Sequence, residues 1–304
     1  QMCIRDRPGW GHLGVRLSGA ADQLAMAAAN LLAGAPIDAP VLEMTLVGPK
    51  LAVLADVTVG LAGADMDARL LEEDRPLAPG GGYLLRAGTT LAFGAAGDGA
   101  RCYLAAGGGL ASPEVLGSAS TDPVAALGGS DRAMADGDLI DSHPGGASEE
   151  RRWPHDTDSS GVVQGSGPVE LAIVEGPHLA LLPARVEDAL AHRTWTVSVH
   201  ADRSGLRLEG DPVSGVSGID LVSVPMIPGA IQVPPCGQPI VLMPDAPTVG
   251  GYPVPGVLAE SDRPRAGQLR AGDRVRFHWI SLGEARRRAN EQAERLAAVA
   301  ASFT

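Results

Sequence analysis

Aromatic residues are scarce in this chain: they fill 3% of its 304 positions, whereas hydrophobic residues fill 45%. Its interior must therefore be built from Val, Leu, Ile and Ala, which are small or branched side chains that suit β-sheets. Forty glycines and 24 prolines add many turns. At this length the composition predicts a mainly β protein with two domains, each with its own core.

Positive charge is also in short supply. The net charge is −12, Lys50 is the only lysine, and arginines are not gathered into a basic stripe. A surface that binds nucleic acid needs clustered Lys and Arg to release counterions from the phosphate backbone. We therefore exclude nucleic acid as a partner, together with any mechanism that needs a second lysine.

Three further features are missing. Cys3, Cys102 and Cys236 lack metal-ligand or CxxC spacing, which argues against a disulfide framework and for a reducing, cytoplasmic compartment. No apolar run approaches the ~20 residues that span a bilayer, so we expect no membrane segment. The seven histidines form no HExxH pair, and the chain has no GxxxxGK[ST] or GxSxG motif, so we expect no metal site and name no cofactor-binding residue.

Local patterns predict the secondary structure. Leu24, Leu31 and their neighbours recur at helical spacing over residues 19–34, with Ser18 as N-cap and Gly34 as the stop. A second short helix is expected over 184–191 and a third over 281–301, where Ser281 and Glu284 have capping-box spacing. Short strands are expected at 41–47, 51–54, 58–61, 83–86, 90–93, 101–104, 170–174, 194–200, 219–224 and 274–279.

Two segments at the margins of these elements are treated separately. The opening residues 1–7 differ in composition from the rest of the chain and are left out of the fold prediction. The tail 281–304 is expected to be dispensable, so that its removal would leave the fold intact.

An internal echo supports two similar modules. Residues 85–93 read LRAGTTLAF and residues 269–277 read LRAGDRVRF, with five identities at equal offsets. A chance recurrence of a turn followed by a strand remains an alternative. The predicted organisation is a β module over 8–140, a linker or mobile loop over 141–168, a second β module over 169–280 and a C-terminal helix over 281–304.

The segment 229–253 reads GAIQVPPCGQPIVLMPDAPTVGGYP and is the richest candidate site. Its apolar run at 240–243 has the length of a buried strand, and Gly and Pro force tight turns on both sides. We expect these turns to gather a set of polar side chains, namely Gln232, Gln238, Asp245, Thr248 and Tyr252. A surface loop that binds no ligand is the alternative.

The segment 200–210, HADRSGLRLEG, adds two guanidinium groups. Arg203 and Arg207 stand beside Asp202 and Glu209. Two arginines can clamp a carboxylate or a phosphate while the acids hold them in place. A purely structural network of arginines and carboxylates is the alternative.

Four segments together resemble a known family. Residues 11–34 (GHLGVRLSGAADQLAMAAANLLAG), 42–49 (LEMTLVGP), 202–210 (DRSGLRLEG) and 229–253 are similar, in this order, to the biotin-dependent carboxyltransferase or allophanate-hydrolase-subunit-2-like family. That family includes the C subunit of the ATP-dependent 5-oxoprolinase, KipA-like proteins and a part of urea carboxylase. The first strand that is usual before the PGW stretch is expected to be missing here.

The resemblance implies two cyclophilin-like β-barrel modules in tandem. It also implies a multi-subunit enzyme, with a KipI-like B subunit and a LamB/YcsF-like A subunit, that opens the lactam of 5-oxoproline to glutamate with ATP and Mg. At matching positions Asp245 and Arg203 are the catalytic candidates, and Asp245 is assigned to acid–base catalysis or Mg-ATP positioning. Arg203 and Arg207 are assigned to the substrate carboxylate or a phosphate, and Gln232, Gln238, Thr248 and Tyr252 to the lactam.

Two other functions stay open. A carboxyltransferase of the urea-carboxylase type would need biotin from a partner, because Lys50 lies in VGPKLAV without the Met-Lys pair of a biotinylated domain. A non-catalytic, KipA-like regulatory module would bind another protein and catalyse nothing.

Overall fold

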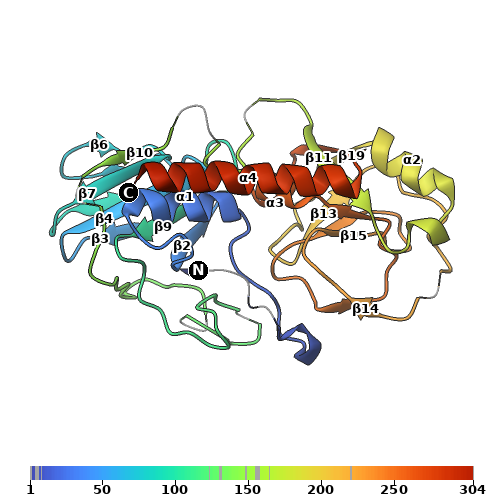
Figure 1. Cartoon of the computed structure of the whole chain (residues 1–304), viewed down its shortest axis with the longest axis horizontal. Coiled ribbons are helices and arrows are strands. Elements are labelled where there is room, and N and C mark those ends of the chain that lie inside the picture. The colour runs from blue at the N-terminus through green and yellow to red at the C-terminus, as the bar shows by residue number, and fades with distance from the viewer. Residues whose placement is uncertain are drawn as a thin grey trace. The chain divides into compact units, whose positions relative to one another are not determined.

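The computed structural model describes residues 2–3, 7, 9–122, 124–129, 132–147, 149–154, 158–163, 165–219 and 221–303. The chain divides into two compact units, which Figure 1 draws with their element labels. The first unit comprises Gln1–Arg7, Ser18–Val163 and Arg295–Thr304, and the second comprises Pro8–Leu17 and Gln164–Glu294. The expected mainly β fold with a C-terminal helix is confirmed, while the module boundaries at 140, 168 and 280 stay predictions.

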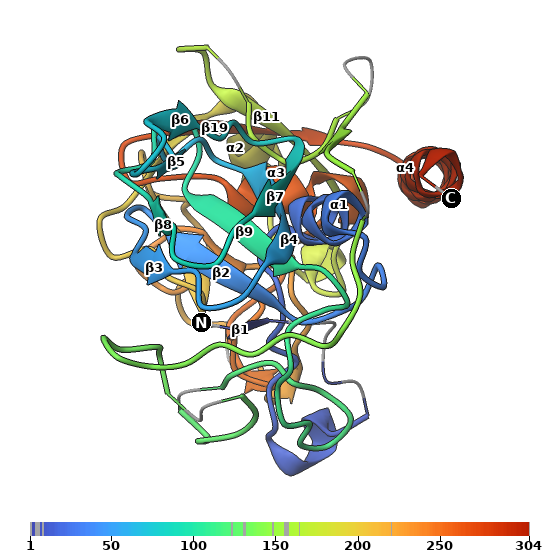
Figure 2. The same cartoon turned by 90° about the vertical axis from the view of Figure 1, so that its left-hand side faces the viewer.

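The first unit has three layers. One sheet has the order β1-β2-β9-β4-β7-β10, and a smaller sheet has the order β3-β8-β5-β6. Helix α1 (Gln23–Ala33) covers the outer face of the larger sheet, as Figure 2 shows. The strands are β1 Met2–Cys3, β2 Val41–Thr45, β3 Lys50–Ala52, β4 Val57–Gly63, β5 Arg69–Leu70, β6 Arg75–Pro76, β7 Gly81–Leu85, β8 Thr90–Ala92, β9 Arg101–Ala106 and β10 Arg151–Arg152.

Strand β9 lies in the middle of these layers, and its sequence reflects that position. All six of its residues are buried. Tyr103 and Ala105 pack on the side of α1, whereas Cys102 and Leu104 pack on the opposite side, in the core that includes Leu70 and other residues of the smaller sheet. A strand covered on both faces needs no alternation of polar and apolar residues.

Helix α1 lies directly on the backbone of the larger sheet. A Cβ atom at Gly60 of β4 would come within 2.0 Å of the Ala29 carbonyl oxygen, and one at Gly82 of β7 within 2.3 Å of the Leu32 carbonyl oxygen. Ala25, Ala28 and other small residues of the helix are fully buried. Two glycines under an alanine-rich helix therefore allow an approach that larger side chains would prevent.

The ends of α1 differ partly from the expectation. Its N-cap is Asp22, whose carboxylate accepts a hydrogen bond from the Ala25 N–H at 2.9 Å. Ser18 is not the cap, because it has a φ of 52° and precedes the helix by several residues. Gly34 ends the helix in the left-handed conformation, as the sequence predicts.

The opening residues take part in the fold, so their exclusion was wrong. Met2 and Cys3 form the two-residue strand β1, which pairs with β2 where the family's first strand was expected to be missing. Arg7 is fully buried and donates hydrogen bonds to the carbonyl oxygens of Ser120 at 2.5 Å and Val115 at 3.2 Å. Residues 4–6 and Pro8 lie outside the described residues.

The second unit is a closed barrel of seven strands in the order β11-β18-β15-β16-β13-β12-β19. All neighbours are antiparallel except β11 and β19, which are parallel. Residues alternate along β19, where Val275 and Phe277 are buried while Arg274 and Arg276 are exposed. The strands are β11 Val169–Glu175, β12 Thr194–Val197, β13 Gly205–Glu209, β15 Ala230–Gln232, β16 Ile240–Leu242, β18 Gly256–Leu258 and β19 Arg274–Trp279.

Smaller elements complete this unit. A two-stranded ribbon joins β14 and β17, and the helix expected at 184–191 is present as α2. The strand expected at 219–224 is wrong, since only Val224 belongs to β14. The bounds are β14 Val224–Pro225, β17 Val249–Gly250, α2 Ala184–His192, α3 Arg263–Gly267, and the 3-10 helices η1 Gly11–Leu13, η2 Leu179–Leu181 and η3 Glu260–Asp262.

The repeated LRAG motif forms the same turn in both units. The N–H of Gly88 donates to Val53 O and the N–H of Gly272 donates to Val197 O, both at 2.8 Å. In return Val53 N donates to Thr89 O, and Val197 N donates to Asp273 O. Gly88 and Gly272 have φ angles of 89° and 90°. The echo in the sequence therefore reflects a repeated structure, because only glycine adopts this backbone without strain.

Part of the segment expected as a linker is packed. Arg151 and Arg152 form β10 beside β7, and Trp153 is 5% exposed. The Arg151 guanidinium donates to the carbonyl oxygens of Leu31 and Phe303. Residues 148, 155–157 and 164 of this segment, including His155, lie outside the described residues.

Helix α4 (Leu282–Ser302) contributes buried residues to core clusters of both units, which argues against the expectation of a dispensable tail. The Ser281 hydroxyl accepts from the Glu284 N–H at 3.1 Å, as its capping spacing predicts. Ala285 packs in a core cluster of the second unit and Val299 in one of the first. Phe303 meets the Trp153 ring edge to face at 6.2 Å.

We expect Gly60→Ala to destabilise the protein, because its methyl group would overlap the Ala29 carbonyl oxygen. Overpacking of this kind costs about 1–3 kcal/mol. Urea unfolding of the whole chain measures the loss. Gly97→Ala is the control, since its Cβ would meet only the Asp65 oxygen at 3.6 Å, and equal stability of the two variants would contradict the proposed close approach.

We also expect Val299→Ala to lower the free energy of unfolding by about 1–3 kcal/mol, as a cavity in a packed core does. Leu282→Ala on the same helix should change it little, because Leu282 is 56% exposed and Val299 is 6% exposed. Thermal or urea unfolding compares the two. An unchanged free energy of unfolding in Val299→Ala would support the expectation that the tail is dispensable.

Candidate functional site

The hairpin between β12 and β13 carries the two candidate arginines. Asp202 shapes its turn, since one carboxylate oxygen accepts from the N–H groups of Ser204 at 2.7 Å and Gly205 at 3.1 Å. This local bond pattern fixes the turn. It places Arg203 just before β13, and Arg207 follows in the middle of that strand.

Arg203 and Asp245 form a two-pronged ion pair. Nε of Arg203 lies 2.7 Å from Oδ2 of Asp245 and Nη2 lies 3.0 Å from Oδ1. Their side chains are only 13% and 10% exposed, and the Asp245 N–H donates to the Arg203 carbonyl oxygen. The pair thus extends the pairing of β13 with β16 beyond Leu242, and it commits both carboxylate oxygens of Asp245.

Arg207 faces outward and has no such partner. It is exposed, and its guanidinium makes no ion pair within the part of the chain that the structure describes. The register aligns Arg207 with Ile240 on β16, and Ile240 with Gln232 on β15. Residues opposite one another on antiparallel strands share a face, so Gln232, Ile240 and Arg207 form one row on the outside of the barrel.

Gln232 lies at the edge of an apolar cluster on that outer face. It is 8% exposed, and the hydrogen-bond acceptor of its amide nitrogen is the Met226 sulfur at 3.6 Å. A thioether is a weak acceptor, so this amide can still gain from a better partner. The cluster itself comprises Ala230, Leu242, Ala246 and Val254, with Met226, Ile240 and Val257 packed against it.

Thr248 lies near Gln232, since its carbonyl oxygen accepts from the Met226 N–H at 2.9 Å. Gln238 does not join this group. Its amide nitrogen donates to the Gly210 carbonyl oxygen at 2.9 Å and its amide oxygen accepts from the Gly210 N–H. Gln238 precedes β16 and Asp245 follows it, so these two residues lie beyond opposite ends of the same strand. The expectation that all five polar residues gather at one place was therefore wrong. Tyr252 is 46% exposed.

Met226 and Ile240 place apolar surface beside Gln232 and Arg207, and neither was among the residues predicted for the site. Met226 stands outside the segment chosen as the site, and Ile240 was assigned to a buried strand. The β-alternation of residues 205–209 is the signal that could have placed Arg207 on the outer face.

Burial raises the pKa of the Cys102 thiol to about 12, so this cysteine stays protonated. The described residues contain no group of three His, Cys, Asp or Glu side chains arranged to hold a metal ion. Among the helices of the described chain, none is long and apolar enough to cross a bilayer.

The comparisons with known proteins identify the family. The model described as carboxyltransferase domain, subdomain A and B, matches residues 13–279. The chain is 34% identical over 287 residues to the C subunit of 5-oxoprolinase from Escherichia coli, and the match covers 94% of this chain and 90% of that protein. The chain therefore belongs to the carboxyltransferase-domain family, in agreement with the resemblance found in its sequence.

Other relatives are longer proteins. A putative urea carboxylase of Emericella nidulans is 31% identical over 300 residues, which are 92% of this chain and 23% of that protein. The crystal structure of Kluyveromyces lactis urea carboxylase gives a TM-score of 0.86 at 26% identity, over 98% of this chain and 28% of that one. This chain spans about half of a further solved protein, TTHA0988, with 53% coverage, 32% identity and a TM-score of 0.80.

We expect Arg203→Met and Asp245→Asn each to destabilise the protein, because each leaves a nearly buried charge without its partner. Such losses reach about 3 kcal/mol. Arg207→Gln should stay within about 0.5 kcal/mol of the parent. Urea unfolding of both single variants and of the double variant checks this: the double variant should lose less than the sum, and strict additivity would mean that the pair is not coupled.

Proposed function

We propose that this chain is the C subunit of a 5-oxoprolinase, an enzyme complex that hydrolyses 5-oxo-L-proline to L-glutamate at the expense of ATP. The observation that carries the proposal is the match to the C subunit of the Escherichia coli 5-oxoprolinase over 94% of this chain and 90% of that protein. The same name belongs to a Haemophilus influenzae relative that is 31% identical over 299 residues.

The reaction explains why a complex and ATP are needed. A lactam is a poor electrophile, because its nitrogen donates electron density to the carbonyl. Transfer of the terminal phosphoryl group of ATP to the lactam oxygen would make the ring carbon open to water, with cleavage of the C–N bond and release of phosphate. We propose that a KipI-like B subunit and a LamB/YcsF-like A subunit complete the enzyme, and that Mg-ATP is bound by the assembled complex.

Within this chain we propose different roles for the two arginines. Arg207 is exposed on the outer row and is the group that meets the substrate carboxylate or a phosphate. Arg203 and Asp245 hold each other and act as positioning residues, since they fix the segment 243–246 beside the row. Gln232 offers its amide to the lactam, and Thr248 and Tyr252 border the same segment.

A carboxyltransferase of the urea-carboxylase type is the second candidate. It is favoured by the family model and by the TM-score of 0.86 to Kluyveromyces lactis urea carboxylase. In that case biotin would arrive on a partner protein, because Lys50 is the only lysine. A KipA-like regulatory role would need neither ATP nor biotin.

The test is ATP-dependent release of glutamate from 5-oxoproline by this chain together with the subunits encoded beside it. We expect activity only with all subunits present, and a fall of about tenfold or more in Arg207→Gln, because a charge-assisted hydrogen bond to an anion is lost. Arg276→Gln, an equally outward arginine on β19, is the matched control and should keep full activity.

The possible outcomes separate the candidates. Carboxylation of urea with a biotin carrier, without glutamate release, would select the carboxyltransferase. Failure of every assay with a folded, assembled complex would overturn both catalytic proposals and leave the regulatory role. Equal losses in Arg207→Gln and Arg276→Gln would reject the assignment of Arg207 while leaving the function untouched.

A further inference from the structure

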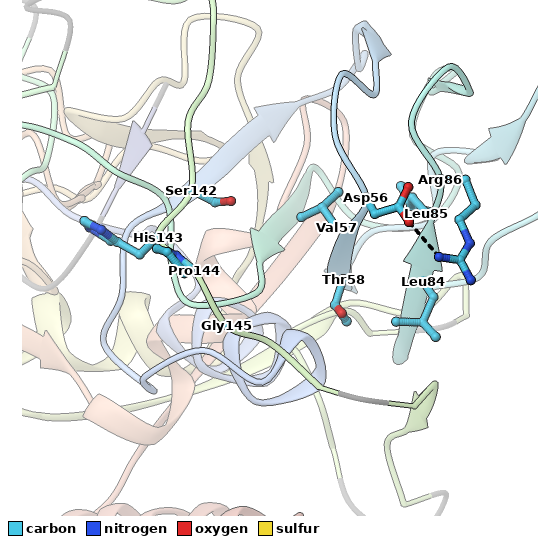
Figure 3. A pocket seen from close by; sticks show the side chains of 10 residues that line it. All are labelled: Asp56, Val57, Thr58, Leu84, Leu85, Arg86, Ser142, His143, Pro144 and Gly145. Atoms are coloured by element: carbon cyan, nitrogen blue, oxygen red, sulfur yellow. Dashed lines mark hydrogen bonds and ion pairs between the residues drawn. The ribbon is translucent and has the colours of Figure 1, made fainter.

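The first unit contains a cavity of about 300 Å³ at one end of β4 and β7. Figure 3 shows its wall: Asp56, Val57 and Thr58 come from the start of β4, and Leu84, Leu85 and Arg86 from the end of β7. The segment 142–145 forms the other wall. The volume corresponds to the lower end of small-molecule sites.

The second wall is built by close contact between two backbones. A Cβ at Gly107 would lie 2.7 Å from the Gly145 carbonyl oxygen, and one at Gly108 would lie 2.3 Å from the His143 carbonyl oxygen. The N–H of His143 donates to the Gly109 carbonyl oxygen, and the N–H of Gly107 to that of Thr58. These contacts hold the segment 142–145 in place opposite β4, so the cavity is preformed.

Opposite charges stand side by side at the rim. The Arg86 guanidinium donates to Oδ2 of Asp56 at 2.6 Å, while Oδ1 of Asp56 accepts from the Ala87 N–H at 2.9 Å. The two side chains are 73% and 57% exposed, so the pair is weak and easily opened. Asp56 would keep its place when Arg86 moves, because the Ala87 bond is independent of the guanidinium.

The carboxylate of Asp56 is charged at neutral pH. The hydrogen bond from Ala87, and then the one from Arg86, lower its pKa from the usual value. Thr58 adds a second acceptor: its hydroxyl donates to the Ala147 carbonyl oxygen at 2.9 Å, which leaves the oxygen's lone pairs available, and the residue is 6% exposed. The Ser142 hydroxyl points toward Val57 in Figure 3.

The equivalent turn of the second unit shows that this charge pair is not needed for the turn itself. Both LRAG turns make the same backbone hydrogen bonds, to Val53 and to Val197. Three residues after these valines stand Asp56 in the first unit and His200 in the second. The turn therefore forms with a histidine at this position, where the Arg270 N–H donates to Asp273 instead, so the Asp56–Arg86 pair is not required for the turn and is free to open for a ligand.

We propose that this cavity binds a small α-amino acid with a short, uncharged side chain. The ammonium group of the ligand would take the place of Arg86 beside Asp56 and Thr58, and its carboxylate would take the place of Asp56 on Arg86. The remaining strand and loop residues, Val57, Leu84, Leu85 and Pro144, are apolar. His143 is turned away from the strand residues in Figure 3, so no lining group matches a third charge.

The test is a titration of the full chain with L-alanine, monitored by the NMR chemical shift of the Ala87 backbone N–H, which reports on Asp56. We expect this chemical shift to change with added L-alanine and to reach saturation. Propionate, which lacks the ammonium group, should bind much more weakly. Arg86→Gln should weaken L-alanine binding about 10- to 100-fold, as loss of a charge-assisted hydrogen bond does. Arg69→Gln, which removes another exposed ion pair of the same unit, is the matched control and should leave affinity unchanged.

A second variant keeps the test decisive if Arg86→Gln has indirect effects. Leu84→Trp fills the cavity from a position that is already 37% exposed, so it should abolish binding in a folded protein. Absence of a saturable Ala87 shift would overturn the proposal, as would unchanged binding in Leu84→Trp. If propionate bound as tightly as L-alanine, the site would be a simple anion site and not an amino-acid site. If L-glutamate bound as tightly as L-alanine, the proposed selectivity for an uncharged side chain would be wrong. None of these readouts involves 5-oxoproline or a partner subunit.

Discussion

The contact between α1 and the backbone of β4 and β7 is the constraint on which the first unit depends. Gly60 and Gly82 let the helix approach until its carbonyl oxygens would touch a Cβ on either strand. At the N-terminal end of the helix, this approach brings Asp22 to Tyr103, whose hydroxyl accepts from the Asp22 N–H and donates to Glu43. Burial raises the pKa of Tyr103 well above its usual value, so it stays a neutral donor. The helix position therefore fixes a buried polar network as well as a core.

The same contact reaches the proposed amino-acid site at the other end of the helix. The Ala33 carbonyl oxygen accepts from the Ala147 N–H, and the Ala147 carbonyl oxygen accepts from the Thr58 hydroxyl. Thr58 lies two residues before Gly60 on β4, on the same face of the sheet. The position of α1 on the sheet thus also places Ala147 beside Thr58, at the edge of the proposed site.

The sequence predicted the features that depend on local chemistry. Gly34, Ser281 and Arg274–Trp279 have signals within a few residues, and the helix stop, the cap and the strand agree with them. Contacts distant in sequence were not predictable in this way. The buried Arg7 bonds to Val115 and Ser120, more than a hundred residues away, and the buried Trp153 packs against Phe303 of the tail. The three-residue strands Ala230–Gln232 and Gly256–Leu258 were missed, because patterns this short are hard to distinguish from a turn.

The candidate site illustrates the same limit. Residue types identified Arg203, Arg207 and Asp245 but could not decide which arginine the carboxylate would hold. That choice depends on register: Gly205 pairs with Leu242, so the residues just beyond, Arg203 and Asp245, meet, while Arg207 falls opposite Ile240. A shift of one residue would turn Arg207 into the barrel and bury its charge, which a core of this kind does not tolerate. The packing of Leu206 and Leu208 inside the barrel is therefore what leaves Arg207 outside and available for an anion.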